Sequence, residues 1–456
     1  MRADLSEPWS SWLVGSLCRP ISSQDRDRAV LHLIDWMGCA TLGSTGEIGD
    51  VLRRWAKRHA SGGNWACGHS ALQASEAIFW NASLGSCHEM DDVHREAVVH
   101  PGDIVIPAAL AIAQREQADS VALLDSIVIG YETAILLGLL GGTGHYTYWY
   151  STATTGVFGS AMACSRVLGL DKQRMQHALG LAGMQSSGLW QCRLEPGLAK
   201  QLAAGHSAQA GLLSADLAAA GMTGPLSILE GPLGWLKATS GNLDRERAKQ
   251  LLQVASDQPW RLHEVSFKPW SACRHVHPAI ECALKLHATG CNPQDLQQIF
   301  LDTYPVAISF ADKVHPQTSL EGKFSLQHAV AWGLTYGSFG LEATAPAALK
   351  DSACVALRSR ISLKSGPEQE AAYPRSFRAH LRVLMQNGSL LSSEVINLLG
   401  DPENPLSRAQ LESKAVTLLL AGGWPSQKAD ELLRICFGLS HDRNLEPLWR
   451  CLTAQH

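Results

Sequence analysis

The chain has 456 residues, of which 46% are hydrophobic and 18% are charged. This balance predicts a large buried core in two or three domains and excludes a disordered protein. The net charge is −4 and no block of Lys or Arg occurs, so we expect no nucleic-acid partner.

Helical spacing dominates the first 260 residues. Apolar residues recur every three or four positions at 24–42, 71–87, 104–116, 119–140, 156–169, 172–187 and 203–220. The last of these segments is rich in Ala and Gly, so we expect it to pack closely on its neighbours and to end at the Gly221 to Pro225 run. The apolar stretch 121–142 contains Asp125 and Glu132, which favour a core helix over a membrane span. No membrane partner is predicted.

The pattern changes after residue 267. Residues 297–310 and 380–395 are strand-like, and Asn387-Gly388 within the second is a strong hairpin signal. A helix is predicted between them at 324–337, and helical spacing returns in the C-terminal tail. The predicted fold is mainly α: a large helical domain formed by the N- and C-terminal segments, 1–267 and 398–456, with a smaller α+β domain, 268–397, inserted between them.

Twelve cysteines are scattered through apolar contexts without a C-x-x-C pair. We interpret them as buried free thiols, a pattern typical of the cytoplasm; a disulfide framework is the weaker alternative. The first apolar run is short and acidic residues precede it, which makes a poor signal peptide. A cytoplasmic location is therefore expected.

The sequence HEMDDVHREAVVHP, residues 88–101, places many charges between two apolar stretches. It has three interpretations: a solvated loop, a metal site that includes His94 and His100, or an acid/base cluster in a substrate cleft. The spacing matches no closed zinc or calcium loop, so no metal is predicted. The cluster would contribute the catalytic candidates Glu89, Asp91, Asp92 and His100.

Further cations and imidazoles occur in apolar surroundings. Lys200 precedes the small-residue helix, and FKPWSACRHVHP contains Lys268, Arg274, His275 and His277 close to the predicted domain boundary. Each residue alone is commonly a surface lysine or a structural histidine. Together they indicate a small anionic ligand.

Six segments then show a resemblance that covers about residues 25 to 420. They are NASLGSCHEMDDVH with HPGDIVIPAALAIA, STATTGVFGSAMACSRVLGL, LAKQLAAGHSAQAGLLSADLAAAGMTGPLSILEGPLGW, FKPWSACRHVHPAI, GKFSLQHAVAWGL and NPLSRAQLESK. In this order they resemble the MmgE/PrpD family, which contains 2-methylcitrate dehydratases, cis-aconitate decarboxylases and an iminodisuccinate epimerase. The resemblance implies a homodimer, an active site in the cleft between the domains, and no metal or organic cofactor.

The family's chemistry suggests a role for each candidate. A carbanion next to a carboxylate needs cations and donors to stabilise it, a role we expect for Lys200 and Lys268, with Arg274, His275 and His277 binding substrate. His100 is the expected acid/base, oriented by a carboxylate of residues 89–92. We expect Lys200, Lys268 and His100 to converge on one cleft.

This chain also departs from the family pattern. Glu89, Met90 and Val93 replace the usual Asp, aromatic and Thr. Tyr150 and His328 stand where many members have a His and a Tyr, which suggests that proton-transfer groups have moved. Tyr146 and His328 are therefore further catalytic candidates, and Tyr150 joins the binding candidates.

The sequence thus predicts a cytoplasmic, cofactor-independent lyase, a dehydratase of the 2-methylcitrate type, that abstracts a proton next to a carboxylate of a small di- or tricarboxylate. The alternatives are an epimerase of a dicarboxylate such as iminodisuccinate, a cis-aconitate-type decarboxylase, or a non-catalytic family member that acts as a binding protein.

Overall fold

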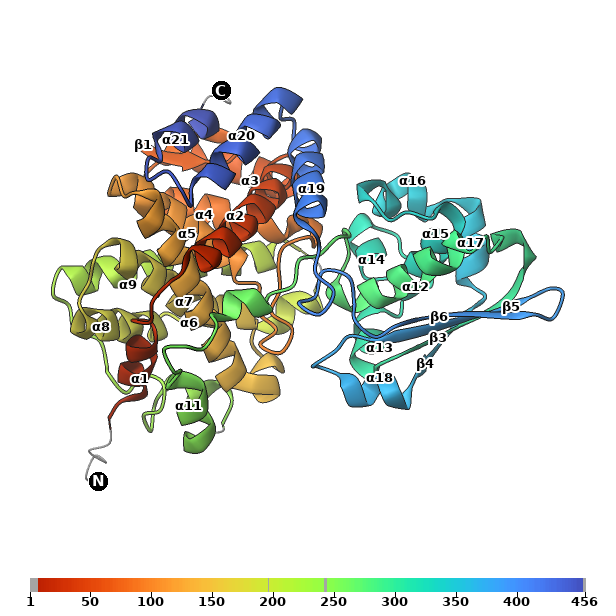
Figure 1. Ribbon diagram of the computed structural model, residues 1–456, viewed down its shortest axis with the longest axis horizontal. Coiled ribbons are helices and arrows are strands. Elements are labelled where there is room, and N and C mark those ends of the chain that lie inside the picture. Colours follow the sequence, from red (N-terminus) through yellow and green to blue (C-terminus); the bar gives the residue numbers. More distant parts are fainter. Residues whose placement is uncertain (1–6, 196, 242–243, 454–456) are drawn as a thin grey trace. The chain divides into compact units, whose positions relative to one another are not determined.

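A computed structural model describes residues 7–195, 197–241 and 244–453, which form two compact units (Figure 1). The helical unit comprises the described residues up to 87, residues 91–265 and those from 407 onward. The α+β unit comprises residues 88–90 and 266–406. The predicted class, mainly α with a smaller α+β part, is confirmed. The sequence prediction drew the boundaries at 267/268 and 397/398 and did not separate residues 88–90.

The helical unit contains most of the helices and one short hairpin. Its elements are α1 Trp9–Ser16, α2 Ser23–Ser44, α3 Glu47–Ala56, β1 Ser61–Ala66, β2 His69–Leu72, α4 Ala74–Ala82, α5 Gly102–Arg115, α6 Ser120–Tyr146, α7 Ser151–Val167, α8 Lys172–Gly183, α9 Ala199–Ala219, α10 Trp235–Thr239, α11 Arg245–Leu252, α19 Arg408–Ala421, α20 Ser426–Gly438 and α21 Glu446–Thr453. All seven helical segments predicted in this half are present, whereas the β1–β2 hairpin was missed.

Small residues let α6, α7 and α9 approach one another closely. A Cβ at Gly159 would lie 2.8 Å from the carbonyl oxygen of Gly130, and one at Gly211 would lie 2.4 Å from Ser160 Cβ. The predicted close packing of the small-residue helix is therefore confirmed. Helix α6 is the apolar stretch long enough to cross a membrane, but 94% of its most apolar window is buried in the helical core. Its charged residue Glu132 pairs with Arg19 at 2.9 Å.

The C-terminal helices pack on the N-terminal ones. Figure 1 shows α19, α20 and α21 in blue beside the red α2 and α3, and α19 lies along α2. Between them, Lys414 Nζ of α19 lies 2.6 Å from Asp35 Oδ1 of α2, with both side chains buried. Burial raises the pKa of Asp35 to about 6, although Lys414 opposes the shift.

The α+β unit is built around a four-stranded sheet of order β4-β3-β5-β6. Strand β4 is parallel to β3, and the other pairs are antiparallel. Helix α12 packs on β5 and β6, and α15 packs on α12. The elements are α12 His277–Ala288, β3 Leu296–Thr303, α13 Pro305–Ala311, α14 Ser319–Lys323, α15 Leu326–Tyr336, α16 Pro346–Leu349, α17 Ser352–Arg358, β4 Ile361–Ser365, α18 Pro367–Ala372, β5 Ala379–Met385 and β6 Leu390–Val395.

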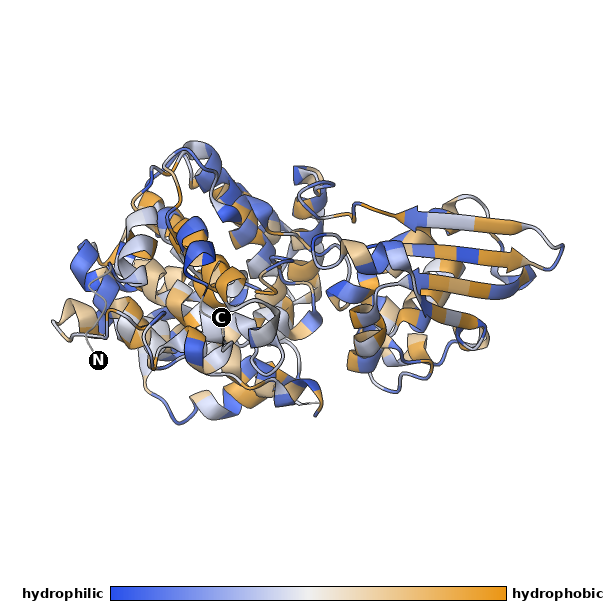
Figure 2. Ribbon diagram, turned by 90° about the horizontal axis from the view of Figure 1, so that it is seen from below, coloured by the Kyte–Doolittle hydropathy of each residue, from blue (hydrophilic) through white to orange (hydrophobic). Residues whose placement is uncertain are grey.

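The predicted hairpin at Asn387-Gly388 is confirmed, since β5 and β6 pair from Leu384 with Leu390 to Ala379 with Val395. Figure 2 shows hydrophobic and hydrophilic residues along these strands, and buried residues alternate with less buried ones in β5. The strand predicted for 297–310 is correct only as far as Thr303. Pro305, at the first position of a helix, starts α13 instead, because its fixed φ suits that position.

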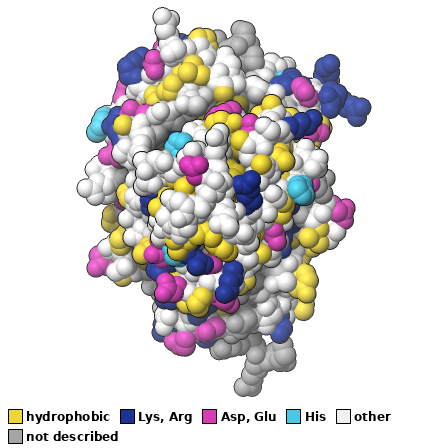
Figure 3. Space-filling view, turned by 90° about the vertical axis from the view of Figure 1, so that its right-hand side faces the viewer, with side chains coloured by type: hydrophobic (Ala, Val, Ile, Leu, Met, Phe, Trp, Pro, Cys, Tyr) yellow, Lys and Arg dark blue, Asp and Glu magenta, His cyan; other side chains and the backbone are white. Residues whose placement is uncertain are grey.

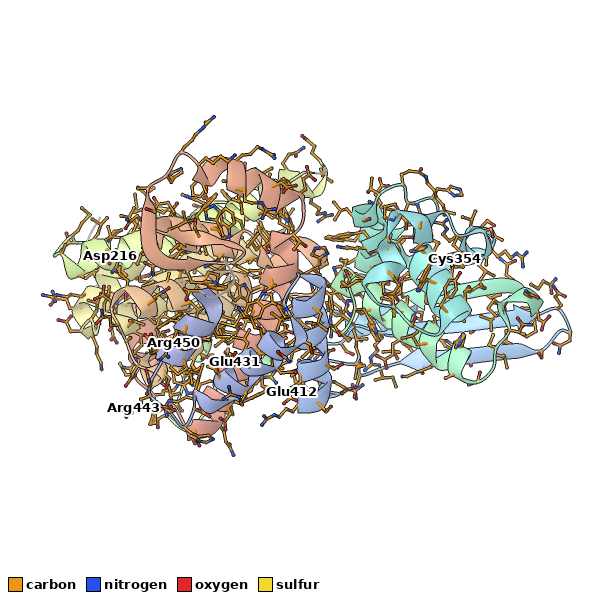
Figure 4. All side chains as sticks on the ribbon, turned by 90° about the horizontal axis from the view of Figure 1, so that it is seen from above. Asp216, Cys354, Glu412, Glu431, Arg443 and Arg450 are labelled. Carbon is orange, nitrogen blue, oxygen red and sulfur yellow. The ribbon has the colours of Figure 1, made fainter. Side chains whose placement is uncertain are left out.

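All twelve cysteines are free, as predicted. Nine are buried, whereas Cys18 is exposed and Cys87 and Cys192 are partly buried, so the prediction that all are buried was wrong for these three. Ion pairs at the surface link neighbouring helices, such as Arg115 with Asp216, or turns of one helix, such as Arg408 with Glu412. Figure 4 labels the two acidic partners, Asp216 and Glu412. Over the face in view in Figure 3, acidic and basic side chains are interspersed.

The buried pair of Asp35 and Lys414 leads to a prediction about stability. Lys414→Met should lower the free energy of unfolding by about 3 to 5 kcal/mol near neutral pH, because the Asp35 carboxylate is left buried without its cation. The pKa of Asp35 already lies above its ordinary 3.8 and should then rise further. A raised carboxyl pKa destabilises the fold as pH rises, so the loss should be smaller at pH 5 than at pH 8.

Urea denaturation of both proteins at the two pH values measures this difference. Lys285→Met is the matched control, because Lys285 is half exposed and pairs with Glu281 within one helix. An equal loss at pH 5 and pH 8 would contradict the assignment to Asp35.

Candidate functional site

The charged segment that follows Met90 is buried in the helical unit. Asp91 is 1% exposed and Asp92 is 3% exposed. The backbone folds back on itself, and the His94 N–H donates to the Val99 carbonyl oxygen at 2.8 Å. The solvated-loop interpretation is therefore wrong for Asp91 and Asp92, whose carboxylates are enclosed, whereas Glu96 in the same segment is exposed.

The Asp92 carboxylate fixes the segment in place. Oδ2 accepts from the Tyr131 hydroxyl and lies beside His32 Nδ1, both at 2.7 Å, and Oδ1 accepts from the Gly102 N–H at 3.1 Å. A Cβ at Gly102 would lie 2.8 Å from both Asp92 Oδ1 and the Tyr131 hydroxyl, so only glycine fits here. Burial lowers the pKa of His32, against the hydrogen bond to Asp92. With three partners on its carboxylate, Asp92 has the contacts of a positioning residue.

His100 lies at the end of this segment with one ring nitrogen held. Its Nδ1 is 2.6 Å from Asp91 Oδ2 and 2.8 Å from the Asp92 carbonyl oxygen. The Asp92 carbonyl oxygen can only accept a hydrogen bond, so Nδ1 carries the proton and the lone pair of the neutral ring is on Nε2. Within the described residues Nε2 makes no hydrogen bond, and the side chain is 15% exposed. This is the arrangement of an oriented general base.

Lys200 and Tyr150 lie in the same part of the helical unit. The His100 N–H donates to Thr152 Oγ1 at 3.1 Å, and the buried Tyr150 hydroxyl lies beside Thr152 without a well-formed hydrogen bond. Lys200 Nζ is 6.0 Å from the centre of the Tyr150 ring. Burial raises the pKa of Tyr150, although Lys200 opposes the shift, so the phenol is a neutral donor. Lys200 is in the first turn of α9, where the helix dipole also favours an anion.

Aromatic packing surrounds Tyr150. Its ring stacks on Trp190 with centroids 4.7 Å apart, and Tyr146 meets the same indole edge-on at 5.7 Å. Gly142, with φ 61° inside α6, kinks the helix just before Tyr146 in a conformation that needs glycine. His145 is buried against Trp235 and contacts Thr154 at 2.7 Å, and burial lowers its pKa to about 4. Tyr146 therefore lies near the predicted site, while His145 is a structural imidazole.

Glu89 and Lys268 meet in the α+β unit. Lys268 is completely buried, and its Nζ lies 3.5 Å from Glu89 Oε2. Glu89 has φ 54°, a left-handed conformation that is uncommon for a residue with a side chain. Such strained positions are common at functional sites. Two of the predicted catalytic residues are therefore in contact here.

Arg274, His275 and His277 are tied to internal partners of the α+β unit. Arg274 pairs with Asp401, which also accepts from Ser266 Oγ at 2.6 Å. His275 Nδ1 lies 2.8 Å from the Tyr304 hydroxyl in an aromatic cluster. His277 lies 3.5 Å from Arg274 Nη1 and 3.0 Å from the Ala272 carbonyl oxygen. Their binding roles stay predictions.

His328 is fully buried in α15. Its Nε2 donates to the Ala343 carbonyl oxygen at 2.6 Å, and burial lowers its pKa to about 4. A neutral, enclosed imidazole is poorly suited to exchange protons with a ligand. Its catalytic role stays a prediction, with less support from its surroundings than that of His100.

Several residues around these groups were missed by the sequence prediction. Lys323 contacts His88 in the α+β unit, and the Asp92 partners Tyr131 and His32 come from α6 and α2. The only signal for Lys323 was a lysine placed directly before an apolar helix, in GKFSLQH. Tyr131 and His32 lie in helical apolar stretches and gave no signal of their own.

His94, a possible ligand in the metal interpretation, has both ring nitrogens engaged. Nε2 lies 3.1 Å from Glu264 Oε2, and Nδ1 accepts from the Ala97 N–H at 3.1 Å. No group of three or more His, Cys, Asp or Glu side chains suited to a metal occurs among the described residues.

Comparison with known proteins agrees with this organisation. Residues 9–248 match the MmgE/PrpD N-terminal domain, and residues 270–436 match the MmgE/PrpD C-terminal domain. The chain belongs to the MmgE/PrpD family. It is 25% identical to a cis-aconitate decarboxylase of Aspergillus terreus over 341 residues, 70% of this chain and 69% of that protein. It is 21% identical to the human cis-aconitate decarboxylase over 430 residues, 91% of this chain and 87% of that protein. These relatives support the role of a lyase-type family member.

The geometry of His100 predicts the effect of its removal. His100→Ala should lower turnover by about a hundredfold to ten-thousandfold, the usual contribution of a general acid or base. Binding of an unreactive carboxylate should change little, because Lys200 is retained. Steady-state kinetics and calorimetry measure the two quantities; Thr152→Val, which leaves the His100 ring contacts intact, is the control. Turnover within a few-fold of wild type would contradict the assignment.

We also predict that exhaustive chelation leaves activity intact, because the ring contacts of His94 and His100 are all to protein groups. The measurement is turnover before and after dialysis against a chelator, with metal content determined in parallel. Loss of activity that one divalent ion restores would revive the metal interpretation.

Proposed function

We propose that this protein is a lyase that acts on a small di- or tricarboxylate through a carbanion next to a carboxylate, without a cofactor. The observation that carries the proposal is His100, whose Nδ1 is held by Asp91 and the Asp92 carbonyl oxygen so that Nε2 can exchange a proton with a ligand. Lys200 in the same unit supplies a nearby positive charge.

The proposed chemistry uses these groups in two ways. In dehydration, the reaction predicted from the sequence, His100 Nε2 takes the proton next to a carboxylate, and the hydroxyl leaves as water with a proton from a second group. In decarboxylation, a carbon–carboxylate bond breaks and CO₂ leaves; His100, which must first take a proton from solvent on Nε2 to become an imidazolium, gives that proton to the carbanion. In both, Lys200 stabilises the charge that builds up on the remaining carboxylate.

Glu89 and Lys268 are the further groups that we assign to the site. One residue separates Glu89 from Asp91 in the sequence, so the peptide chain holds their Cα atoms within about 7 Å of each other. Two neighbouring positions of one short segment therefore make these contacts: Glu89 contacts Lys268, and Asp91 contacts His100. This adjacency supports a shared role for the two lysines and His100.

Decarboxylation of a cis-aconitate-like acid is the second candidate. The Aspergillus and human relatives are both named cis-aconitate decarboxylases. Decarboxylation also needs a single proton donor, whereas dehydration needs a base and an acid. His145 and His328 are buried and have pKa values lowered to about 4, and both ring nitrogens of His94 are engaged by protein groups, whereas His100 Nε2 makes no hydrogen bond within the described residues.

An epimerase would need two proton-transfer groups on opposite faces of the substrate. Tyr150, beside Lys200, is a poor base because burial raises its pKa, which argues against this alternative. A binding protein without catalysis would not need an imidazole oriented with a free Nε2.

Proton NMR in deuterated water separates these reactions. Citrate, 2-methylcitrate, cis-aconitate and iminodisuccinate are each incubated with the protein and with His100→Ala. Dehydration gives a new alkene from a hydroxy acid, decarboxylation gives deuterium at the carbon that loses CO₂, and epimerisation gives exchange without an alkene. Binding of these acids without any turnover or exchange would contradict the proposed activity.

The two lysines should differ from His100 when they are replaced. Lys200→Ala or Lys268→Ala should raise KM and also lower kcat, because each cation would hold a substrate carboxylate in the ground state and interact more strongly with it as negative charge builds up in the transition state. Kinetics on any substrate found above measures both parameters. Thermal melts are needed for Lys268→Ala, since Glu89 loses its buried partner. A change in kcat alone would contradict a binding role.

A further inference from the structure

Lys323 and His88 form a contact in the α+β unit that the proposed mechanism does not use. Lys323 Nζ lies 3.3 Å from His88 Nδ1, and Lys323 is only 6% exposed. Lys323 is the last residue of α14, a helix that starts with a capping box of Thr318 and Glu321. The Lys323 carbonyl oxygen accepts from the Cys273 N–H at 3.0 Å. The lysine is therefore held by its backbone and does not extend freely from the surface.

Burial and the contact with Lys323 determine the protonation state and the tautomer of the His88 imidazole. Burial, and then the positive charge of Lys323, lower the pKa of His88 to about 4, so the ring is neutral at pH 7. An ammonium group can only donate a hydrogen bond, so Nδ1 carries the lone pair and Nε2 carries the proton. His88 and Lys323 thus form a pair in which both side chains can donate to an anion.

The neighbouring residues place a second buried ammonium beside the same segment. Glu89, which follows His88, pairs with Lys268 at 3.5 Å, and Ser271 Oγ donates to the His88 carbonyl oxygen at 2.8 Å. The segment His88–Met90 is therefore contacted by two lysines that are almost completely buried. A bound carboxylate would accept charge-assisted hydrogen bonds from such ammonium groups, and these are stronger than hydrogen bonds between neutral groups.

We propose that Lys323 and His88 form a second carboxylate-binding subsite, which accepts a carboxylate of the ligand other than the one next to the reacting carbon. The inference rests on the proposed function and deepens it, because it makes Lys323 a specificity-determining residue for substrates with two or more carboxylates. The Lys323 ammonium and the His88 Nε2–H donate to the two oxygens of that carboxylate. Monocarboxylates, which cannot fill both positions, bind more weakly.

Calorimetry with tricarballylate, a tricarboxylate with no hydroxyl or alkene to react, tests the subsite without turnover. Lys323→Met and His88→Phe should each weaken binding by about tenfold or more, the range for a hydrogen bond to a charged group. Methionine keeps an unbranched chain, one heavy atom shorter, and removes the ammonium group. Lys285→Met, an exposed lysine of the same unit paired with Glu281, should bind as wild type does. Thermal melts establish that each variant is folded.

The effect of tricarballylate on the titration of His88 gives a measurement that a purely structural role of the Lys323–His88 contact would not produce. NMR of the labelled imidazole should show a pKa well below 6.5 in the free protein, because Lys323 contributes to the lowering. Lys323→Met should raise this pKa. Tricarballylate should raise it in the wild type, because a carboxylate beside the ring favours the imidazolium.

The possible results of these experiments distinguish a failure of the proposed subsite from a failure of the proposed lyase activity. If a carboxylic acid is turned over but Lys323→Met and His88→Phe bind tricarballylate as wild type does, the subsite is wrong and the proposed function stands. If tricarballylate binding depends on Lys323 and shifts the His88 titration while no acid is turned over, the subsite stands and the lyase activity fails. If the folded wild type binds no carboxylate, both are overturned.

Discussion

The Asp92 carboxylate is the constraint on which the arrangement of the helical unit's candidate site depends. It accepts from Tyr131 of α6 and from the Gly102 N–H at the start of α5, and it contacts His32 of α2. A single buried side chain therefore joins the consecutive helices α5 and α6 to α2, which lies much earlier in the sequence. Because the Asp92 carbonyl oxygen also holds His100 Nδ1, the orientation of the imidazole is set by the same residue that ties the helices together.

Asp92 is one of several buried charged residues in the helical unit. Asp35 and Lys414 pair between α2 and α19, and the carboxylates of Asp91 and Asp92 contribute to the raised pKa of Asp35. Each charge in such a low-dielectric region influences the protonation of the others. Within the described residues the Asp92 carboxylate has hydrogen-bond partners on both oxygens, and His100 retains a ring nitrogen without a protein partner.

Hydrophobic periodicity and turn residues indicate local structure, and the elements predicted correctly are those that depend on local structure. The helices, the small-residue packing of α9 and the Asn387-Gly388 hairpin could be predicted because each depends on residues close in the sequence. The helix α13 was missed because the apolar stretch that indicates a strand continues past Pro305, where the helix starts. The β1–β2 hairpin was missed as well.

For the site, the sequence could indicate the chemical types but not the pairings. The segment 88–101 and Lys200 stood out as charges in apolar surroundings. The contacts of Asp92 with Tyr131, 39 positions away, and of Lys323 with His88, 235 positions away, depend on how the chain folds over long distances. Nothing in a single sequence distinguishes Tyr131 from any other tyrosine in an apolar helix.

The packing of α19 on α2 has a consequence for the newly made chain. The chain passes between the two units four times, and the helical unit is completed only by residues from 407 onward. At about 5 to 20 residues per second, a ribosome needs roughly 20 to 75 seconds between making Asp35 and making Lys414. During that time the face of α2 that α19 will cover, with its carboxylate, has no partner helix. Until α19 has been made, the nascent chain therefore exposes an apolar face of α2 that carries the Asp35 carboxylate without its Lys414 partner.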